Sequence, residues 1–184
     1  MISHFITKQI TYDGSQITSL WSFRKTGVTD DSIVTFIGPC RISRKNMVDL
    51  EDLKTGAKIS SPLMLHFIIE YVNPDLTKTI LYQRLLTVTI KECLEKMIGK
   101  ELTRDGSNLY DGNAKLTISI ATHTSVSTKI HFGINIISSG TPVVTKGLQD
   151  YRIEPKRFAL EVMKRYIEEI TDITRDRCKV RGVK

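Results

Sequence analysis

The strongest constraint in the sequence is a run of alternating residues from Val126 to Ile136. Every second position in this run is Val, Thr, Ile or Phe. Successive side chains of a β-strand point to opposite faces, so the run predicts a strand with one face in the core. The other face carries five polar or small residues, Ser127, Lys129, His131, Gly133 and Asn135. A sheet containing this strand should bury one side and present polar groups on the other.

Two further runs supply neighbouring strands. Leu116 to Ala121 also alternates and follows the turn signal Asp111-Gly112, so it should pair antiparallel with the first run. Leu63 to Val72 has apolar residues on both faces, which is typical of a strand covered on both sides. His66 and Glu70 share one of those faces.

Two long helices are expected beside these strands. Thr77 to Ile98 carries apolar residues at helical spacing and is followed by Gly99, which favours a helix end. Pro155 suits a first helical position, and apolar residues recur at helical spacing up to Ile170, so this helix should run to about residue 173. The fold class is therefore α+β, with a mixed, mostly antiparallel sheet and helices packed on one face.

The first sixty residues are less regular. Ile6 to Thr11 is a short strand candidate, and Ser15 to Arg24 has the pattern of a helix with Ser15 as its N-cap. Asp31 to Ile37 is predicted to be a strand that Gly38-Pro39 ends. From Arg41 to Ile59 the pattern is weak, which indicates a long surface loop.

Length and composition indicate an ordinary globular chain. The length suits one domain spanning residues 1–184, and the apolar share of 40% with 26% charged residues argues against disorder. The three cysteines are far apart and without zinc-ligand spacing, which predicts no metal site and a reducing, cytoplasmic location. No stretch approaches the ~18 apolar residues of a spanning helix, so no membrane contact is expected.

The segment from Ser107 to Lys115 carries the residues with the most chemical meaning. It reads S-N-L-Y-D-G-N-A-K and precedes a predicted strand. Upstream lie Ser61-Pro62, a strand, Asn73-Pro74-Asp75-Leu76 and a long helix, and downstream lies Gly133-Ile134-Asn135. In order and spacing, the stretch from Ser61 to Ile136 resembles the core of the biotin- and lipoate-protein ligases.

The whole chain is also similar to an uncharacterised prokaryotic family, the domain of unknown function 366 group. The stretches that carry this similarity are Met47–Asp52, Met64–Glu70, Gln83–Leu86, Ser125–Thr128 and His131–Asn135. That family is thought to share the ligase-like fold. The similarity therefore implies a fold more directly than an activity.

The ligase resemblance implies a small carboxylate, acyl or acyl-adenylate ligand and an acyltransferase type of activity. Lys115 aligns with the lysine of those enzymes, and an ammonium group there would offset the repulsion between a carboxylate and a phosphate. His131 is a candidate general base or carbonyl donor. The alternatives are an ordinary exposed lysine and a hydrogen-bonded structural histidine. The candidate ligand-binding residues are Arg41, His66, Arg104, Ser107, Asn108, Gly133 and Asn135.

Two departures from the ligase pattern bear on the cofactor. ATP and Mg²⁺ are what the resemblance implies, but the glycine- and arginine-rich loop of the ligases has no counterpart around Gly38. Asn108 also stands where the ligases have an aspartate, and an amide is a poorer Mg²⁺ ligand than a carboxylate. Both departures argue against adenylation.

The charge distribution supports a second hypothesis. The net charge is +7, and the segment from Arg175 to Lys184 holds five basic residues and one acid. A solvated tail is the favoured interpretation. The alternative is a non-catalytic module that binds nucleic acid such as tRNA, because the fold also resembles class II tRNA synthetase cores. A third hypothesis is a homodimer formed through the Phe158–Ile170 helix face, although burial of that face in the chain's own core is favoured.

Overall fold

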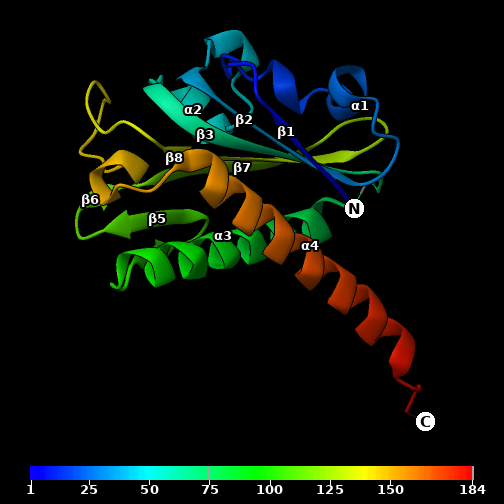
Figure 1. Cartoon of the computed structure of the whole chain (residues 1–184). Helices are drawn as coiled ribbons and strands as arrows, with labels where there is room; N and C mark the ends of the chain where they lie inside the picture. Colours follow the sequence, from blue (N-terminus) through cyan, green and yellow to red (C-terminus); the bar gives the residue numbers. More distant parts are fainter. Residues whose placement is uncertain (74, 184) are drawn as a thin grey trace.

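A five-stranded sheet lies at the centre of the computed structural model, which describes residues 1–73 and 75–183 (Figure 1). The strand order is β1 (Ile2–Ile6), β2 (Ser32–Arg41), β3 (Ser60–Tyr71), β8 (Thr128–Asn135) and β7 (Thr117–His123). β1 is parallel to β2 and the other neighbours are antiparallel, which confirms the mixed, mostly antiparallel sheet. Pro74 and Lys184, which belong to the predicted P-D-L motif and basic tail, lie outside the described residues.

The two long helices pack on one face of this sheet (Figure 1). They are α3 (Leu76–Ile98) and α4 (Pro155–Lys179), and the main core lies between them and the sheet. Phe158 and Tyr166 of α4 are fully buried there, so this helix face packs into the chain's own core. The helix runs to Lys179 instead of residue 173, and its last turns project from the body of the molecule (Figure 1). No helix among the described residues combines the length and the apolar character that crossing a membrane requires.

Shorter elements complete the fold. The other sheet face is covered by the segments that connect β1 to β2 and β2 to β3, which form η1 (Ser15–Ile17), α1 (Trp21–Thr26), η2 (Arg44–Asn46) and α2 (Leu50–Thr55). A small antiparallel sheet consists of β4 (Thr103–Asp105), β5 (Asn108–Asp111) and β6 (Ala114–Lys115). The turn η3 (Leu148–Tyr151) precedes α4.

The N-terminal strand and the end of β2 both differ from the prediction, and Gly38 explains why. β1 occupies Ile2–Ile6 instead of Ile6–Thr11, and β2 continues through Gly38-Pro39 with an irregular register before Cys40. A Cβ atom on Gly38 would lie 1.8 Å from the backbone oxygen of Ile10. The glycine therefore lets the chain that follows β1 cross directly against β2, where a larger residue would clash.

The predicted helix from Ser15 to Arg24 is wrong because a distant carboxylate interrupts it. Leu20 adopts a left-handed conformation with φ of 54°, so η1 and α1 are separate pieces. Oε1 of Glu70 accepts the backbone N–H of Leu20 at 2.7 Å, and Oε2 accepts that of Ser22 at 3.3 Å. These bonds satisfy the first amides of α1, as an N-cap would.

The predicted loop from Arg41 to Ile59 also contains helical structure, since α2 lies within it. Asp49 caps α2 by accepting the N–H groups of Glu51 at 2.9 Å and Asp52 at 3.1 Å. A capped helix of six residues buries no apolar stripe, which is why its periodicity is absent from the sequence.

Candidate functional site

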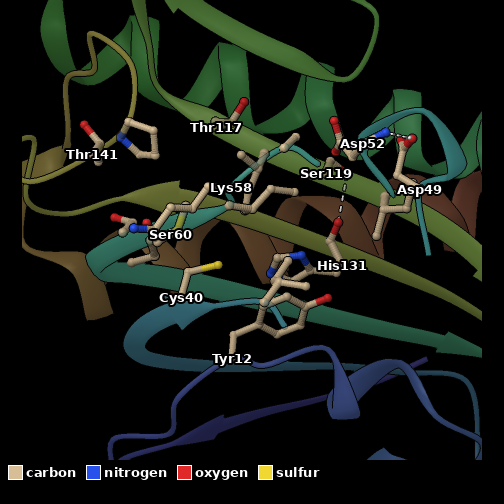
Figure 2. Close-up of a pocket in the computed structure, with 18 of the residues that line it drawn as sticks. Tyr12, Cys40, Asp49, Asp52, Lys58, Ser60, Thr117, Ser119, His131 and Thr141 are labelled. Atoms are coloured by element: carbon tan, nitrogen blue, oxygen red, sulfur yellow. Dashed lines mark hydrogen bonds between the residues drawn. The ribbon is translucent and has the colours of Figure 1, made fainter. Parts of the chain in front are cut away.

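A cavity of about 420 Å³ lies on the face of the sheet opposite α3 and α4. Its floor comes from β2, β3, β7 and β8, and its walls come from residues 46–59 and 141–145. Figure 2 shows the side chains that reach into it. Apolar residues such as Met64 and Ile118 line it together with polar and charged groups. We call it the sheet cavity.

Two histidines on neighbouring strands make direct contact at its floor. Nδ1 of His66 on β3 lies 3.0 Å from Nε2 of His131 on β8, and Nε2 of His66 lies 3.1 Å from the backbone oxygen of Gly38. Both rings are buried, but His131 also lines the cavity. Their strands pair in a register that places His66 opposite Gly133 and His131 opposite Ile68, so the two rings are diagonal neighbours.

Both imidazoles are neutral at physiological pH. Burial lowers the pKa of His66 to about 3, although its bond to Gly38 opposes the shift. Burial and the neighbouring His66 together lower the pKa of His131 well below its ordinary value. A neutral ring of such weak basicity can accept a hydrogen bond, but it is poorly suited to holding a proton as a general base.

Tyr12 covers the cavity-lining histidine. Its ring stacks on His131 with the centroids 3.5 Å apart and the planes 9° from parallel, and Figure 2 shows the two rings together. The backbone of Tyr12 holds it there, because its N–H donates to Pro39 and its oxygen accepts from Arg41. Burial raises the pKa of the Tyr12 hydroxyl well above its ordinary value, so the hydroxyl stays protonated.

Lys115 sits where several segments meet. Its backbone N–H donates to Val144 at 2.9 Å, and its backbone oxygen accepts from Lys146 at 3.2 Å. Asn135 links this point to the sheet, since its Nδ2 donates to the Lys115 oxygen at 3.4 Å and its Oδ1 accepts from Ser61 Oγ at 3.0 Å. Lys115 lines the sheet cavity, and so does Lys58.

Asp111 anchors the 141–146 loop, which forms one wall of the sheet cavity. Its carboxylate pairs with Lys100, lies 2.7 Å from Nζ of Lys146, and accepts the hydroxyl of Tyr151 at 2.8 Å. Hydrogen bonds from Lys100 and Lys146 hold the pKa of this carboxyl well below its ordinary value, with Tyr151 adding to them against the effect of burial. Asp111 therefore ties the small sheet to the 141–146 loop.

A second buried charge pair lies on the same face but does not line the cavity. Lys129 Nζ is 2.6 Å from Glu70 Oε2, and both side chains are almost fully buried. Burial would raise the pKa of Glu70, but the hydrogen bond and charge of Lys129 lower it below its ordinary value, helped by Ser127 and Leu20. Burial also lowers the pKa of Lys129 to about 8 against the influence of Glu70. This pair supports the Leu20 turn and α1.

The structure brings four of the predicted site residues together. Lys115, His131, Asn108 and Asn135 all line the sheet cavity. His66 lies behind His131 as its hydrogen-bond partner.

The other predicted residues lie elsewhere. Gly133 is in the sheet beneath Met64, whose Cε would be 3.0 Å from a Cβ there. Arg41 is exposed and lines a neighbouring hollow. Arg104 and Ser107 do not line the cavity, and Arg104 instead donates to the Gly106 oxygen of its own turn, 2.7 Å away.

Several cavity residues were not singled out from the sequence. They are Tyr12, Cys40, Lys58, Asp49 and Asp52. The last two belong to the Met47–Asp52 stretch, which the family resemblance had marked. Tyr12 and Lys58 come from irregular segments, where no periodicity indicates the direction of a side chain.

The architecture is that of the biotin- and lipoate-protein ligases. A biotin protein ligase from Aquifex aeolicus, solved in complex with biotin and ATP, has a TM-score of 0.62 at 13% identity, covering 91% of this chain and 70% of that chain. A lipoate-protein ligase A bound with ATP gives 0.53 at 12%, covering 93% and 86%. At these identities the likeness shows the fold alone.

Relatives at higher identity define the family. The model of the Domain of unknown function (DUF366) matches residues 1–181, so the chain belongs to that family. An uncharacterised protein of Methanocaldococcus jannaschii is 37% identical over 179 residues, which cover 94% of this chain and 80% of that one. A solved structure described as a protein of unknown function from Pyrococcus horikoshi has 38% identity and a TM-score of 0.94, covering 100% and 99%.

Proposed function

We propose that the sheet cavity binds a small organic carboxylate or acyl compound, with its anionic group near Lys115 and Lys58. Two lysines that line one mainly apolar cavity, each without an ion-pair partner in the described part of the chain, carry this proposal. A cation in a partly dehydrated cavity attracts an anion more strongly than one in open solvent. The apolar floor suits the carbon skeleton of such a ligand.

The acidic residues of the cavity do not remove this attraction. Asp49 already accepts two backbone N–H groups of α2. Asp49 and Asp52 lie together in Figure 2, at the opposite end of the view from Thr141, whose loop pairs with Lys115. We therefore expect the anion at the Lys115 end of the cavity.

The cavity favours binding over covalent catalysis. Burial raises the pKa of the Cys40 thiol to about 12, so this residue is protonated and a weak nucleophile. His131 is neutral and weakly basic for the same physical reason. Acyl transfer, which the ligase likeness suggests, would need a nucleophile supplied by a second substrate.

The cavity departs at one residue from the Mg²⁺ and ATP site that the fold family implies. Among residues 1–73 and 75–183, no three His, Cys, Asp or Glu side chains gather in a way that could hold a metal ion. Asn108 lines the cavity with an amide in place of a carboxylate. The proposal therefore involves no step through a nucleotide.

Mass spectrometry of small molecules extracted from purified protein tests the proposal. We expect a carboxylate to co-purify with the wild type and with Lys54→Met, which removes an exposed charge from α2 outside the cavity. Lys115→Met should weaken binding of that compound about 10- to 100-fold, the usual effect of losing a charged hydrogen bond. The absence of any carboxylate, or equal loss in both variants, would count against the proposal.

Nucleic-acid binding has a weaker basis. The basic residues at the C-terminal end lie on the exposed last turns of α4, and two of them already have acidic partners. Arg175 is 3.0 Å from Asp172, and Lys179 pairs with Asp176. This hypothesis stays a prediction, as does the homodimer, and RNA affinity that falls with rising salt would support it.

A further inference from the structure

We propose that the sheet cavity selects carboxylates that also carry an N–H or O–H donor, because the His66–His131 pair offers the ligand only an acceptor. This inference rests on the proposed function, since it specifies which carboxylates the cavity takes. It depends on the direction of the hydrogen bonds that run from the backbone of β2 through both rings.

The contact between His66 and the backbone oxygen of Gly38 determines the direction of those bonds. A backbone carbonyl can only accept, so the contact of 3.1 Å requires Nε2 of His66 to carry the proton. A neutral His66 then has a bare Nδ1, which must accept across the 3.0 Å contact from Nε2 of His131. The proton of His131 is thereby fixed on Nε2, and its Nδ1 is left with only a lone pair.

Within residues 1–73 and 75–183, that lone pair has no hydrogen-bond partner. None of the described residues donates a hydrogen bond to Nδ1 of His131, and the ring is one of those that line the cavity. The stacked ring of Tyr12 keeps the imidazole from turning. Its hydroxyl does not define the selection, because a phenol can both donate and accept.

A ligand without a donor would displace water from Nδ1 of His131 without supplying a hydrogen bond in its place. Burying an unpaired acceptor is costly, whereas a ligand N–H or O–H would replace the lost water. Among otherwise identical carboxylates, we expect the one with a donor to bind about 10- to 100-fold more tightly. The matching class is a carboxylate that also bears an amide or hydroxyl group.

The first measurement concerns the free protein. ¹⁵N NMR of the histidine side chains distinguishes a protonated ring nitrogen from a bare one. We expect a protonated Nε2 and a bare Nδ1 in both His66 and His131. A proton on Nδ1 of His131 would overturn the proposal whatever the ligand is.

The second measurement uses matched probes, the monoamides of linear dicarboxylates with four to eight carbons and their N,N-dimethyl forms. Isothermal titration should show tighter binding of the primary amide to the wild type and to Tyr12→Phe. His131→Phe keeps a flat ring but lacks the acceptor, so it should abolish the preference. His66→Phe frees the His131 proton to change position and should reduce it, which provides a second variant if the first folds poorly.

The outcomes separate the two proposals. Equal binding of both probes in the wild type, with weaker binding in Lys115→Met, would overturn the donor preference and leave the carboxylate site intact. If neither probe binds at millimolar concentration at any chain length, both proposals fail. A preference that persists in His131→Phe would also overturn the assignment to this ring.

Discussion

The neutral histidine pair predicts an acid sensitivity that can be calculated. The pKa of each folded histidine is lowered from an ordinary value of 6.5, to about 3 for His66. In the unfolded chain both rings would titrate near that ordinary value. The unfolded state therefore binds more protons than the folded state once the pH falls below 6.5, and stability must decline with falling pH.

The size of this decline follows from proton linkage. At pH 5, an unfolded histidine with a pKa of 6.5 is stabilised by protonation by about 2 kcal/mol, whereas the folded ring gains almost nothing. The pair should therefore lower the free energy of unfolding by about 4 kcal/mol between pH 8 and pH 5. That is a large part of the roughly 5–15 kcal/mol that stabilises a typical domain. Carboxyl groups contribute little in this window, since they titrate mainly below it.

Urea denaturation at pH 8, 7, 6 and 5 measures this dependence. The control is a variant with His4→Gln and His123→Gln, which removes the two exposed histidines and should leave the slope unchanged. A fall of no more than about 2 kcal/mol across this range would mean that at least one buried ring is charged in the folded protein. That result would refute both the neutral pair and the direction of its hydrogen bonds.

Two other predictions concern the Lys129–Glu70 ion pair and the Asp111 carboxylate. Lys129→Met should lower the free energy of unfolding by about 3–5 kcal/mol, because Glu70 would stay buried without its counter-charge. Chemical denaturation measures the loss, and adding Glu70→Gln should recover much of it, so a double variant as unstable as the single one would contradict the reasoning. Asp111→Asn should speed amide exchange at Lys115 and Lys146 several-fold, because the loop loses its anchor. Exchange mass spectrometry would reveal it, and unchanged protection would be the contrary result.

The parts of the fold that the sequence predicts are those set by local periodicity. The strand pair β7–β8, the central strand β3 and both long helices follow from runs of alternating or helically spaced residues. The break at Leu20 could not be predicted in this way, because Glu70, which causes it, is fifty positions away. The continuation of β2 past Gly38-Pro39 likewise depends on the crossing of another segment, at Ile10.

The same distinction applies to the candidate site, where local alternation indicates some residues and others depend on contacts between distant segments. Alternation along β8 placed His131 and Asn135 on one face, and both line the cavity with Lys115. The contact between His66 and His131 required the register of β3 on β8, which alternation alone does not determine. Lys58 could not be predicted, because it follows α2, a short helix that no periodicity in the sequence indicates.

The polar face shared by β3 and β8 has three zones, and among the described residues only the middle one holds a ring nitrogen without a protein partner. At one end, Glu70 and Lys129 neutralise each other and hold the turn before α1. At the other end, both side-chain atoms of Asn135 are already bonded, to β3 and to the backbone of β6. In the middle, both ring nitrogens of His66 form hydrogen bonds within the protein, and one ring nitrogen of His131 does so. The other nitrogen of His131 belongs to a ring that lines the cavity, and it is the acceptor to which the proposed ligand would donate.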